Sequence, residues 1–224
     1  MASSRELPSD CKLEELEKYK KTLQRLSEPI ISNNGRTYEY IDTDVNYGQK
    51  RFYIDVLDHY EFVAASVTSI KSYNSNEIDE VTCTGKVDEN LIVVERVNMK
   101  KTIGKGNCTK AVAYLIKTLM LEAKKGSCNL FPHEGTVYVS SKNACSAANC
   151  YIKAFMLNGF DYDKEELKEF QDEVKNDDVN YELNFKNKKQ EQEQKRITTT
   201  TRKRKRELLH KELLNLQRIK ELKF

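Results

Sequence analysis

Residues 91–123 read LIVVERVNMKKTIGKGNCTKAVAYLIKTLMLEA, and this stretch decides the fold. Its first seven residues are rich in β-branched side chains, which is typical of a buried strand. Gly104 and Gly106 then permit a tight turn. After the turn, four aliphatic residues recur at helical spacing and predict an amphipathic helix: Val112, Leu115, Ile116 and Leu119. The order is therefore strand, glycine turn, helix.

A second strand and helix follow. Residues 136–141 predict a strand, and residues 144–158 predict a helix in which Ala148, Ile152 and Phe155 share one face. Gly159 follows directly, at a position where glycine commonly ends a helix. Further strands are predicted at residues 37–41, 51–57, 62–70, 81–84 and 179–185, and further helices at residues 12–27 and 164–174.

Charge is divided unevenly along the 224 residues. Residues 186–224 contain 14 Lys and Arg against 5 Asp and Glu, whereas the whole chain has a net charge of only +3. An acidic body therefore precedes a basic tail. We predict an N-terminal helical segment (1–35), one α/β domain (36–185), and a basic tail (186–224) that is partly disordered and ends in an amphipathic helix.

The N-terminal sequence lacks the apolar segment of a signal peptide, and no apolar run is long enough to cross a bilayer. We expect an intracellular, soluble protein that makes no membrane contact, located in the cytoplasm or also in the nucleus. The six cysteines form no CxxC pair, and the three histidines lie far apart. We therefore expect reduced thiols and no metal site.

A glycine turn between a strand and a helix exposes backbone N–H groups at the positive end of the helix dipole, which suits a diphosphate. Lys101 and Lys105 add positive charge. A purely structural turn is the alternative, because two glycines at this spacing are a weak signal. The P-loop and the dinucleotide fingerprint are excluded, since neither Gly-Lys-Ser/Thr nor the third glycine follows.

Two segments resemble motifs of the GNAT acetyltransferase superfamily. Residues 101–106 (KTIGKG) resemble the family's Gln/Arg-x-x-Gly-x-Gly/Ala motif, and residues 154–160 (AFMLNGF) resemble its Leu-Tyr-x-x-x-Gly-Phe ending. The match covers residues 91–160. The resemblance implies an α/β (α+β) fold with a mixed, mostly antiparallel central sheet and flanking helices, and it implies acetyl-CoA as cosubstrate.

By this resemblance, the backbone amides of residues 103–107 hold the coenzyme diphosphate. Strand 91–97 is implied to separate from strand 136–141 and to pair with the pantetheine. Asn149 fits the family's helix asparagine with a shift of one residue. The residues that the resemblance places along the coenzyme are Val97, Lys101, Ile103, Gly104, Lys105, Gly106, Asn107, Cys108, Asn149 and Phe155.

Transfer to an amine needs one group that takes a proton from the amine and another that gives a proton to the departing thiolate. Glu95 is the candidate base, and an exposed strand residue is the alternative. The family's usual acid is a tyrosine, and Phe155 stands in its place. Tyr151, one helical turn earlier, is the candidate substitute, and a core tyrosine is the alternative. Cys108, near a helix N-terminus, is either a nucleophile or a packing residue.

The predicted function is an N-acetyltransferase that moves an acetyl group from acetyl-CoA directly to an amine of a protein, peptide or small molecule. The alternative is a non-catalytic protein of the same fold that binds nucleic acid or a protein partner through its basic tail. In that tail, Arg202–Arg206 (RKRKR) are five consecutive cations. Such a run is typical of a nuclear import signal, of phosphate binding, or of a solvated segment.

Overall fold

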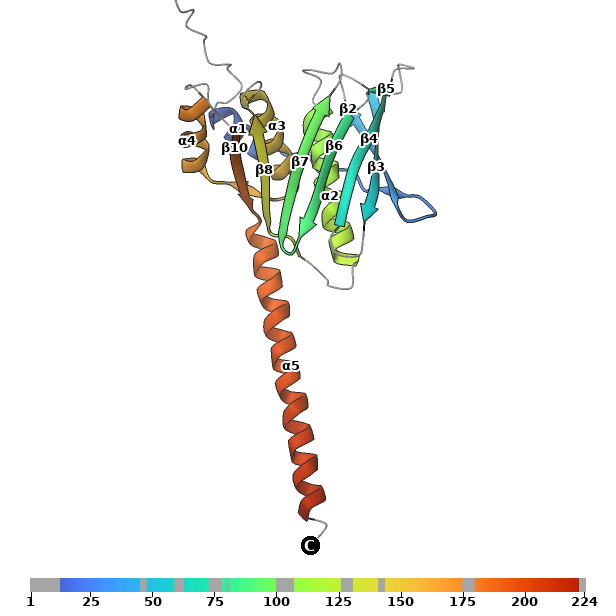
Figure 1. Cartoon of the computed structure of the whole chain (residues 1–224), viewed down its shortest axis with the longest axis vertical. Helices are drawn as coiled ribbons and strands as arrows, with labels where there is room; N and C mark the ends of the chain where they lie inside the picture. The colour runs from blue at the N-terminus through green and yellow to red at the C-terminus, as the bar shows by residue number, and fades with distance from the viewer. Residues whose placement is uncertain are drawn as a thin grey trace, which may run out of the picture. The chain divides into compact units, whose positions relative to one another are not determined.

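The computed structural model describes residues 13–44, 48–58, 63–72, 78–79, 81–99, 107–125, 131–140, 144–174 and 180–221. The chain divides into two compact units, Met1–Asn187 and Lys188–Phe224. The first unit has a mixed α+β fold in which a large sheet is flanked by helices (Figure 1), and the predicted fold class is confirmed. The described part of the predicted N-terminal segment, residues 13–35, belongs to this larger unit.

The sheet contains, within the described residues, ten strands: β1 (Ile30–Ile31), β2 (Thr37–Asp44), β3 (Gly48–Asp58), β4 (Val63–Ser72), β5 (Ile78–Asp79), β6 (Val81–Asp88), β7 (Leu91–Met99), β8 (Glu134–Ser140), β9 (Asp161–Tyr162) and β10 (Asn180–Lys186). Their order is β1-β2-β3-β4-β6-β7-β8-β10-β9, and β5 pairs with β4. These pairs are antiparallel except for β7 and β8, which are parallel.

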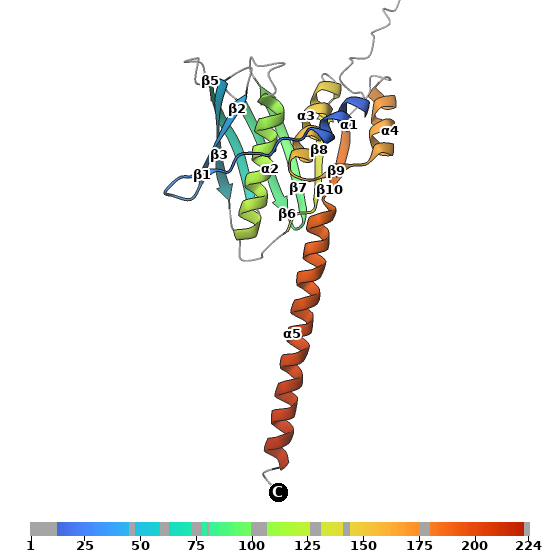
Figure 2. The ribbon, with the colours of Figure 1, turned by 180° about the vertical axis from the view of Figure 1, so that it is seen from behind.

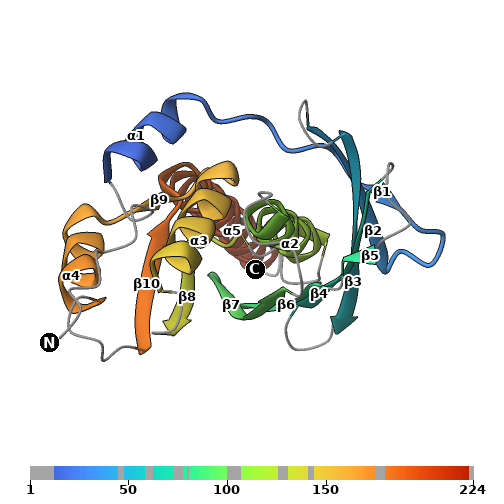
Figure 3. The same ribbon diagram turned by 90° about the horizontal axis from the view of Figure 1, so that it is seen from above.

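The described part of the first unit has four helices: α1 (Leu13–Lys21), α2 (Asn107–Lys125), α3 (Ala144–Leu157) and α4 (Lys164–Val174). Figure 3 shows α1, α2 and α3 on one side of the sheet. Because side chains alternate along a strand, one face of β3 is buried, and it carries Phe52, Ile54 and Val56 as predicted. The other face of β3 is polar, and there Arg51 forms an ion pair with Glu39 of β2 at 2.9 Å.

Helix α2 lies at the centre of the core. Its predicted apolar stripe is fully buried and consists of Val112, Leu115, Ile116 and Leu119. Opposite this stripe β6 carries Gly85, where a methyl group would lie 2.9 Å from the carbonyl oxygen of Val93 and 3.2 Å from the side chain of Leu119. The carbonyl of β7, together with the close approach of α2, therefore favours glycine at residue 85.

Helix α1 is shorter than the predicted helix at residues 12–27. The N–H of Thr22 donates to the carbonyl of Tyr19 at 2.9 Å and closes the last turn. The chain then continues without helical structure, and Leu26 is buried. This connecting segment crosses the outer side of α2 (Figure 2). There Lys117 of α2 donates to the carbonyl of Ser27 at 2.7 Å, so tertiary contacts take the place of a longer helix.

Helix α3 ends at the predicted glycine. Gly159 has φ = 82°, a conformation that glycine adopts without strain. Its N–H donates to the carbonyl of Met156 at 3.0 Å, and the N–H of Phe160 donates to the carbonyl of Phe155 at 3.1 Å. These two bonds form a Schellman motif, which fixes the direction in which the chain leaves the helix.

The second unit is formed by α5 (Lys188–Glu221), a single helix of 34 residues. The sequence predicted a partly disordered tract before a terminal helix, whereas Lys188–Glu221 form one continuous helix. Lys, Arg, Gln and Glu favour helix, Glu191 pairs with Lys195 one turn later, and the hydroxyl of Thr199 donates to the carbonyl of Lys195 at 2.7 Å. Among the described residues, no helix is both long and apolar enough to cross a membrane.

Candidate functional site

The parallel strands β7 and β8 separate partway along their length. Pairing runs from Leu91 opposite Glu134 to Val94 opposite Val137 and ends there, although β7 continues to Met99 and β8 to Ser140. Figure 1 shows the two strands diverging toward their C-terminal ends. The later residues of β7 therefore have a backbone edge that β8 does not cover, as the sequence resemblance implied.

A bulge lies on β7 at the point of separation. Thr84 of β6 is opposite Arg96 and Gly85 is opposite Val94, so Glu95 has no residue opposite it. A bulge of this kind leaves the extra residue outside the hydrogen-bond ladder and increases the local twist. It therefore lies where β7 turns away from β8.

The candidate base Glu95 is exposed, and its carboxylate forms an ion pair with Lys86 of β6 at 3.3 Å. Lys86 alternates with the buried residues Gly85 and Val87 and therefore lies on the sheet face opposite α2. Glu95 therefore lies on this face of the sheet, the open face, which is opposite the one that packs against α2. It lies next to the point where the pairing of β7 with β8 ends.

The first turn of α2 follows β7 in the chain. Five of the predicted coenzyme contacts lie outside the described residues: Lys101, Ile103, Gly104, Lys105 and Gly106. Asn107 begins the helix and is buried, and its side-chain Oδ1 accepts a hydrogen bond of 2.6 Å from Nζ of Lys50 on β3. Lys50 is itself 6 % exposed. A buried ammonium group therefore lies beside the first residue of α2.

A pocket of about 410 Å³ lies against this first turn. This volume is within the usual range for ligand sites. Five elements and the segment after α1 supply its walls, and the lining residues are Tyr19, Thr22, Gln24, Asp42, Lys50, Phe52, Asn107, Thr109, Lys110, Lys153 and Leu157. The lining therefore combines apolar surface with several charged groups.

Three lysines and one carboxylate line the pocket, which makes its formal charge positive. Lys110 of α2 forms an ion pair with Asp42 at 3.3 Å, and Nζ of Lys153 on α3 lies 5.2 Å from the centre of the Tyr19 ring. Burial, and secondarily the charge of Asp42, raise the pKa of Tyr19 to about 12. Its hydroxyl is therefore neutral at physiological pH and able to donate a hydrogen bond. This chemistry favours an anionic ligand.

Helix α3 places the candidate acid Tyr151 under the separated part of β7. Tyr151 is 7 % exposed, and burial raises its pKa to about 12, with a further contribution from Cys83 of β6. Cys83 is opposite Val97 in the sheet, and Val97 itself packs against the core. Tyr151 is therefore a protonated group on the helix side of the sheet, whereas Glu95 is on the open face.

Asn149 lies two residues before Tyr151. Its side-chain Oδ1 is buried and has no hydrogen-bond partner within the described part of the chain. A buried acceptor without a partner carries a desolvation cost, which a ligand donor would relieve.

The predicted contact between Phe155 and the coenzyme is not supported. Phe155 is fully buried, and its ring stacks on Phe185 of β10 with the centroids 4.0 Å apart. The ring also lies directly on Gly135 of β8, where a methyl group would be 2.2 Å from it. The side chain at the family's tyrosine position therefore packs between α3, β8 and β10 and offers no surface to a ligand.

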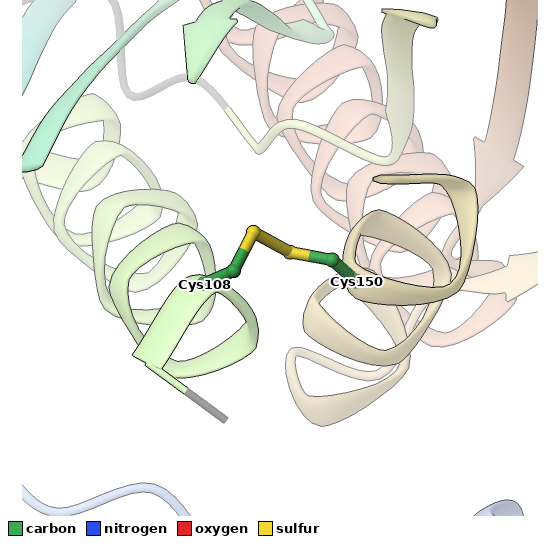
Figure 4. The surroundings of a disulfide bond; sticks show 2 residues. All are labelled: Cys108 and Cys150. Atoms are coloured by element: carbon green, nitrogen blue, oxygen red, sulfur yellow. A yellow bond between two sulfur atoms is a disulfide. The ribbon is translucent and has the colours of Figure 1, made fainter. Parts of the chain in front are cut away.

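The expectation that all thiols are reduced is wrong for Cys108 and Cys150, which form a disulfide (Figure 4). The bond joins the first turn of α2 to α3 across a Cα–Cα distance of 6.1 Å. Cys108 is therefore neither a free nucleophile nor a simple packing residue. Cys83 and Cys145 are free and buried, and burial raises the pKa of the Cys83 thiol well above its usual value. No local sequence pattern signals this pairing, because 42 positions separate the two cysteines.

Sequence reasoning also missed Tyr138, the first residue of β8 beyond the paired part. It is 55 % exposed, whereas Val137 and Val139 are buried, so it lies on the open face together with Glu95. The alternation in TVYVSS could have identified it. The pocket residues Lys50, Lys110 and Lys153 come from three separate elements, so no sequence motif connects them.

Comparison with known proteins does not extend these observations. No protein-family model matches the sequence, and neither the curated proteins nor the solved structures give a match to it.

Proposed function

We propose that this protein is an acyl-coenzyme A dependent N-acyltransferase that uses acetyl-CoA and a primary amine. The single observation that carries the proposal is the end of β7–β8 pairing at Val94 and Val137, on the strand that precedes α2 in the chain. An uncovered strand edge next to a helix N-terminus suits an extended, amide-containing chain that ends in a diphosphate. The resemblance of KTIGKG to the GNAT motif points to the same ligand.

At the diphosphate end, the proposal assigns binding to the start of α2. The first N–H groups of a helix lack partners within the helix and favour an anion. The nearby pocket adds Lys50, Lys110 and Lys153. Asn107 and Cys108 belong to the first turn itself. The unpaired acceptor of Asn149 on α3 would suit an N–H group of the pantetheine, because diphosphate oxygens only accept hydrogen bonds. The disulfide between Cys108 and Cys150 would hold these two helices at a fixed separation.

At the reactive end, the thioester carbonyl would lie beside the bulge on β7. The backbone N–H groups that follow the bulge would donate to the carbonyl oxygen as it gains negative charge. Tyr151 would give a proton to the departing thiolate, because a pKa of about 12 keeps the phenol protonated. Glu95 would take a proton from the amine, directly or through a water molecule.

The open face of the sheet would admit the amine. Glu95 and Tyr138 are both exposed on this face, beside the end of the strand pairing. The acceptor would therefore enter from the side opposite α2 and α3, so that neither substrate blocks the other. This arrangement supports direct transfer within a ternary complex rather than an acylated protein, in agreement with the loss of Cys108 as a nucleophile.

The alternative is a protein of the same fold that has no transferase activity. It is favoured by Phe155, because this residue supplies no hydroxyl group and is buried in the core. Under this alternative, Tyr151 is a core tyrosine and Glu95 is a surface residue that pairs with Lys86.

A thiol-release assay with acetyl-CoA and a panel of peptides and polyamines separates the two. General acid or base catalysis contributes about 10²–10⁴-fold, so Tyr151→Phe and Glu95→Gln should each lower kcat by at least about 100-fold. Tyr162→Phe and Glu134→Gln are matched controls, because both residues lie away from the separated part of β7 and should leave kcat unchanged. No turnover with any amine would reject the transferase.

A further inference from the structure

The part of α5 between residues 194 and 206 has a composition that the transferase proposal does not use. Its sequence is QKRITTTTRKRKR, with seven cations and no acidic residue. Every side chain from residue 195 to residue 212 is exposed. The segment is therefore a bare cationic helix rather than part of a core.

Lys195 pairs with Glu191 one turn earlier, but residues 194–206 contain no acidic residue that could pair with the other six cations. Arg202 and Arg206 are four residues apart, a spacing at which like charges destabilise a helix. The hydroxyls of Thr199, Thr200 and Thr201 donate to carbonyls one turn earlier, at 2.7 to 2.9 Å. These short side chains do not shield the charges on either side of them. A polyanion would relieve the repulsion.

The positions of the cations define one dominant stripe. At 3.6 residues per turn, five of the seven lie within an arc of about 120° over a length of about 17 Å. This cationic stripe consists of Lys195, Arg196, Arg202, Lys203 and Arg206. Arg204 and Lys205 lie on the remaining sides of the helix, so positive charge surrounds it.

This distribution discriminates between kinds of polyanion. A helix that lies on a membrane needs a broad apolar face, and Ile197 is the sole aliphatic residue from 194 to 206. The major groove of B-form DNA is about 12 Å wide and admits one helix between two rows of phosphates. A helix with cations on all sides can contact both rows, whereas a flat anionic surface would engage one side.

We propose that residues 194–206 of α5 bind double-stranded DNA by lying in the major groove and contacting the phosphates of both strands. The cationic stripe tracks one strand, and Arg204 with Lys205 reaches the other. Contacts with the phosphates fix the position of the helix on the duplex but carry no sequence information directly. Binding is therefore largely independent of sequence and strongly dependent on salt.

Fluorescence anisotropy of the full chain with a labelled DNA duplex of about 20 base pairs, two helical turns, tests this proposal. Each phosphate contact changes the slope of log K against log salt by about −0.9, so a slope of about −4 to −6 is expected. A stripe variant with Gln at all five positions should retain a slope of about −1 to −2 and should bind at least about 100-fold more weakly. Far-UV circular dichroism checks that Gln, a good helix former, preserves the helix.

The matched control removes five exposed cations from the first unit: Lys18→Gln, Lys21→Gln, Arg36→Gln, Lys124→Gln and Lys168→Gln. It has the same net charge as the stripe variant and should bind DNA like the wild type. Equal losses in the two variants would overturn the proposal, because net charge alone would then explain the affinity.

Other polyanions define the remaining outcomes. An RNA duplex has a deep, narrow major groove that side chains cannot enter, so it should bind at least about tenfold more weakly than DNA. Equal affinity for both duplexes would overturn docking in the groove. Polyglutamate or anionic vesicles that bind as tightly as DNA would assign the helix to an acidic protein or a membrane instead.

Discussion

Removal of the disulfide between Cys108 and Cys150 is expected to destabilise the first unit strongly. The two cysteines are 42 positions apart. In the chain-entropy model, closure of a loop of this size stabilises the folded state by about 4 kcal/mol. For a domain of about 150–250 residues, each kcal/mol corresponds to about 2–4 °C in Tm. Cys108→Ser or Cys150→Ser should therefore lower the Tm by about 8–16 °C.

Thermal unfolding followed by circular dichroism, with and without a thiol reductant, measures this effect. Reductant should lower the Tm of the wild type to that of the two serine variants and should leave those variants unchanged. Cys145→Ala, which removes a buried free thiol, should keep the response to reductant. Stabilisation by the disulfide would be disproved if the oxidised wild type unfolds at the same temperature as Cys108→Ser, or if an alkylating agent labels Cys108 and Cys150 before reduction.

Three further predictions concern the packing and protonation of α3. Gly135→Ala places a methyl group 2.2 Å from the Phe155 ring, so it should cost about 1–3 kcal/mol in urea unfolding, and the smaller side chain of Phe155→Leu should recover part of this loss. Phe155→Tyr should not raise kcat and should cost about 1–3 kcal/mol, because its hydroxyl would be buried without a partner; a gain in kcat would show that the ring reaches the substrate. Burial raises the pKa of Tyr151 to about 12, so its active, protonated form persists as pH rises and the rate should show no falling limb below about pH 10. A falling limb between about pH 7 and 9 that Tyr151→Phe abolishes would contradict this assignment.

The sequence predicted the fold well where periodicity was strong. The structure confirms the strand at 91–97, the helix that follows it and the C′ position of Gly159. Buried β-branched runs and apolar stripes at helical spacing can be recognised from neighbouring residues in the sequence alone. The edge strands β1, β5 and β9 were missed, since two-residue strands have no period to detect. The early end of α1 was also missed, because tertiary contacts of Leu26 and Ser27 outweigh the helical spacing of the leucines.

The candidate site was predicted less completely than the fold. The separation of β7 from β8 followed from the family resemblance, and the alternation in β8 contained a signal for Tyr138. The disulfide and the lysine-lined pocket depend on how distant elements pack, which no spacing within one segment encodes. The interpretation of Phe155 rested only on its position in a motif. In the structure, contacts with Gly135 and Phe185 place its side chain in the core.

A crystal structure of the full chain grown with coenzyme A would show where the coenzyme binds. We expect the pantetheine along the edge of β7 beyond Val94, between the separated strands, and the diphosphate at the first turn of α2. The Cys108–Cys150 bond should remain intact in the complex. Coenzyme A bound elsewhere on the protein, or β7 and β8 paired along their full length with no ligand between them, would contradict acyl transfer at this site.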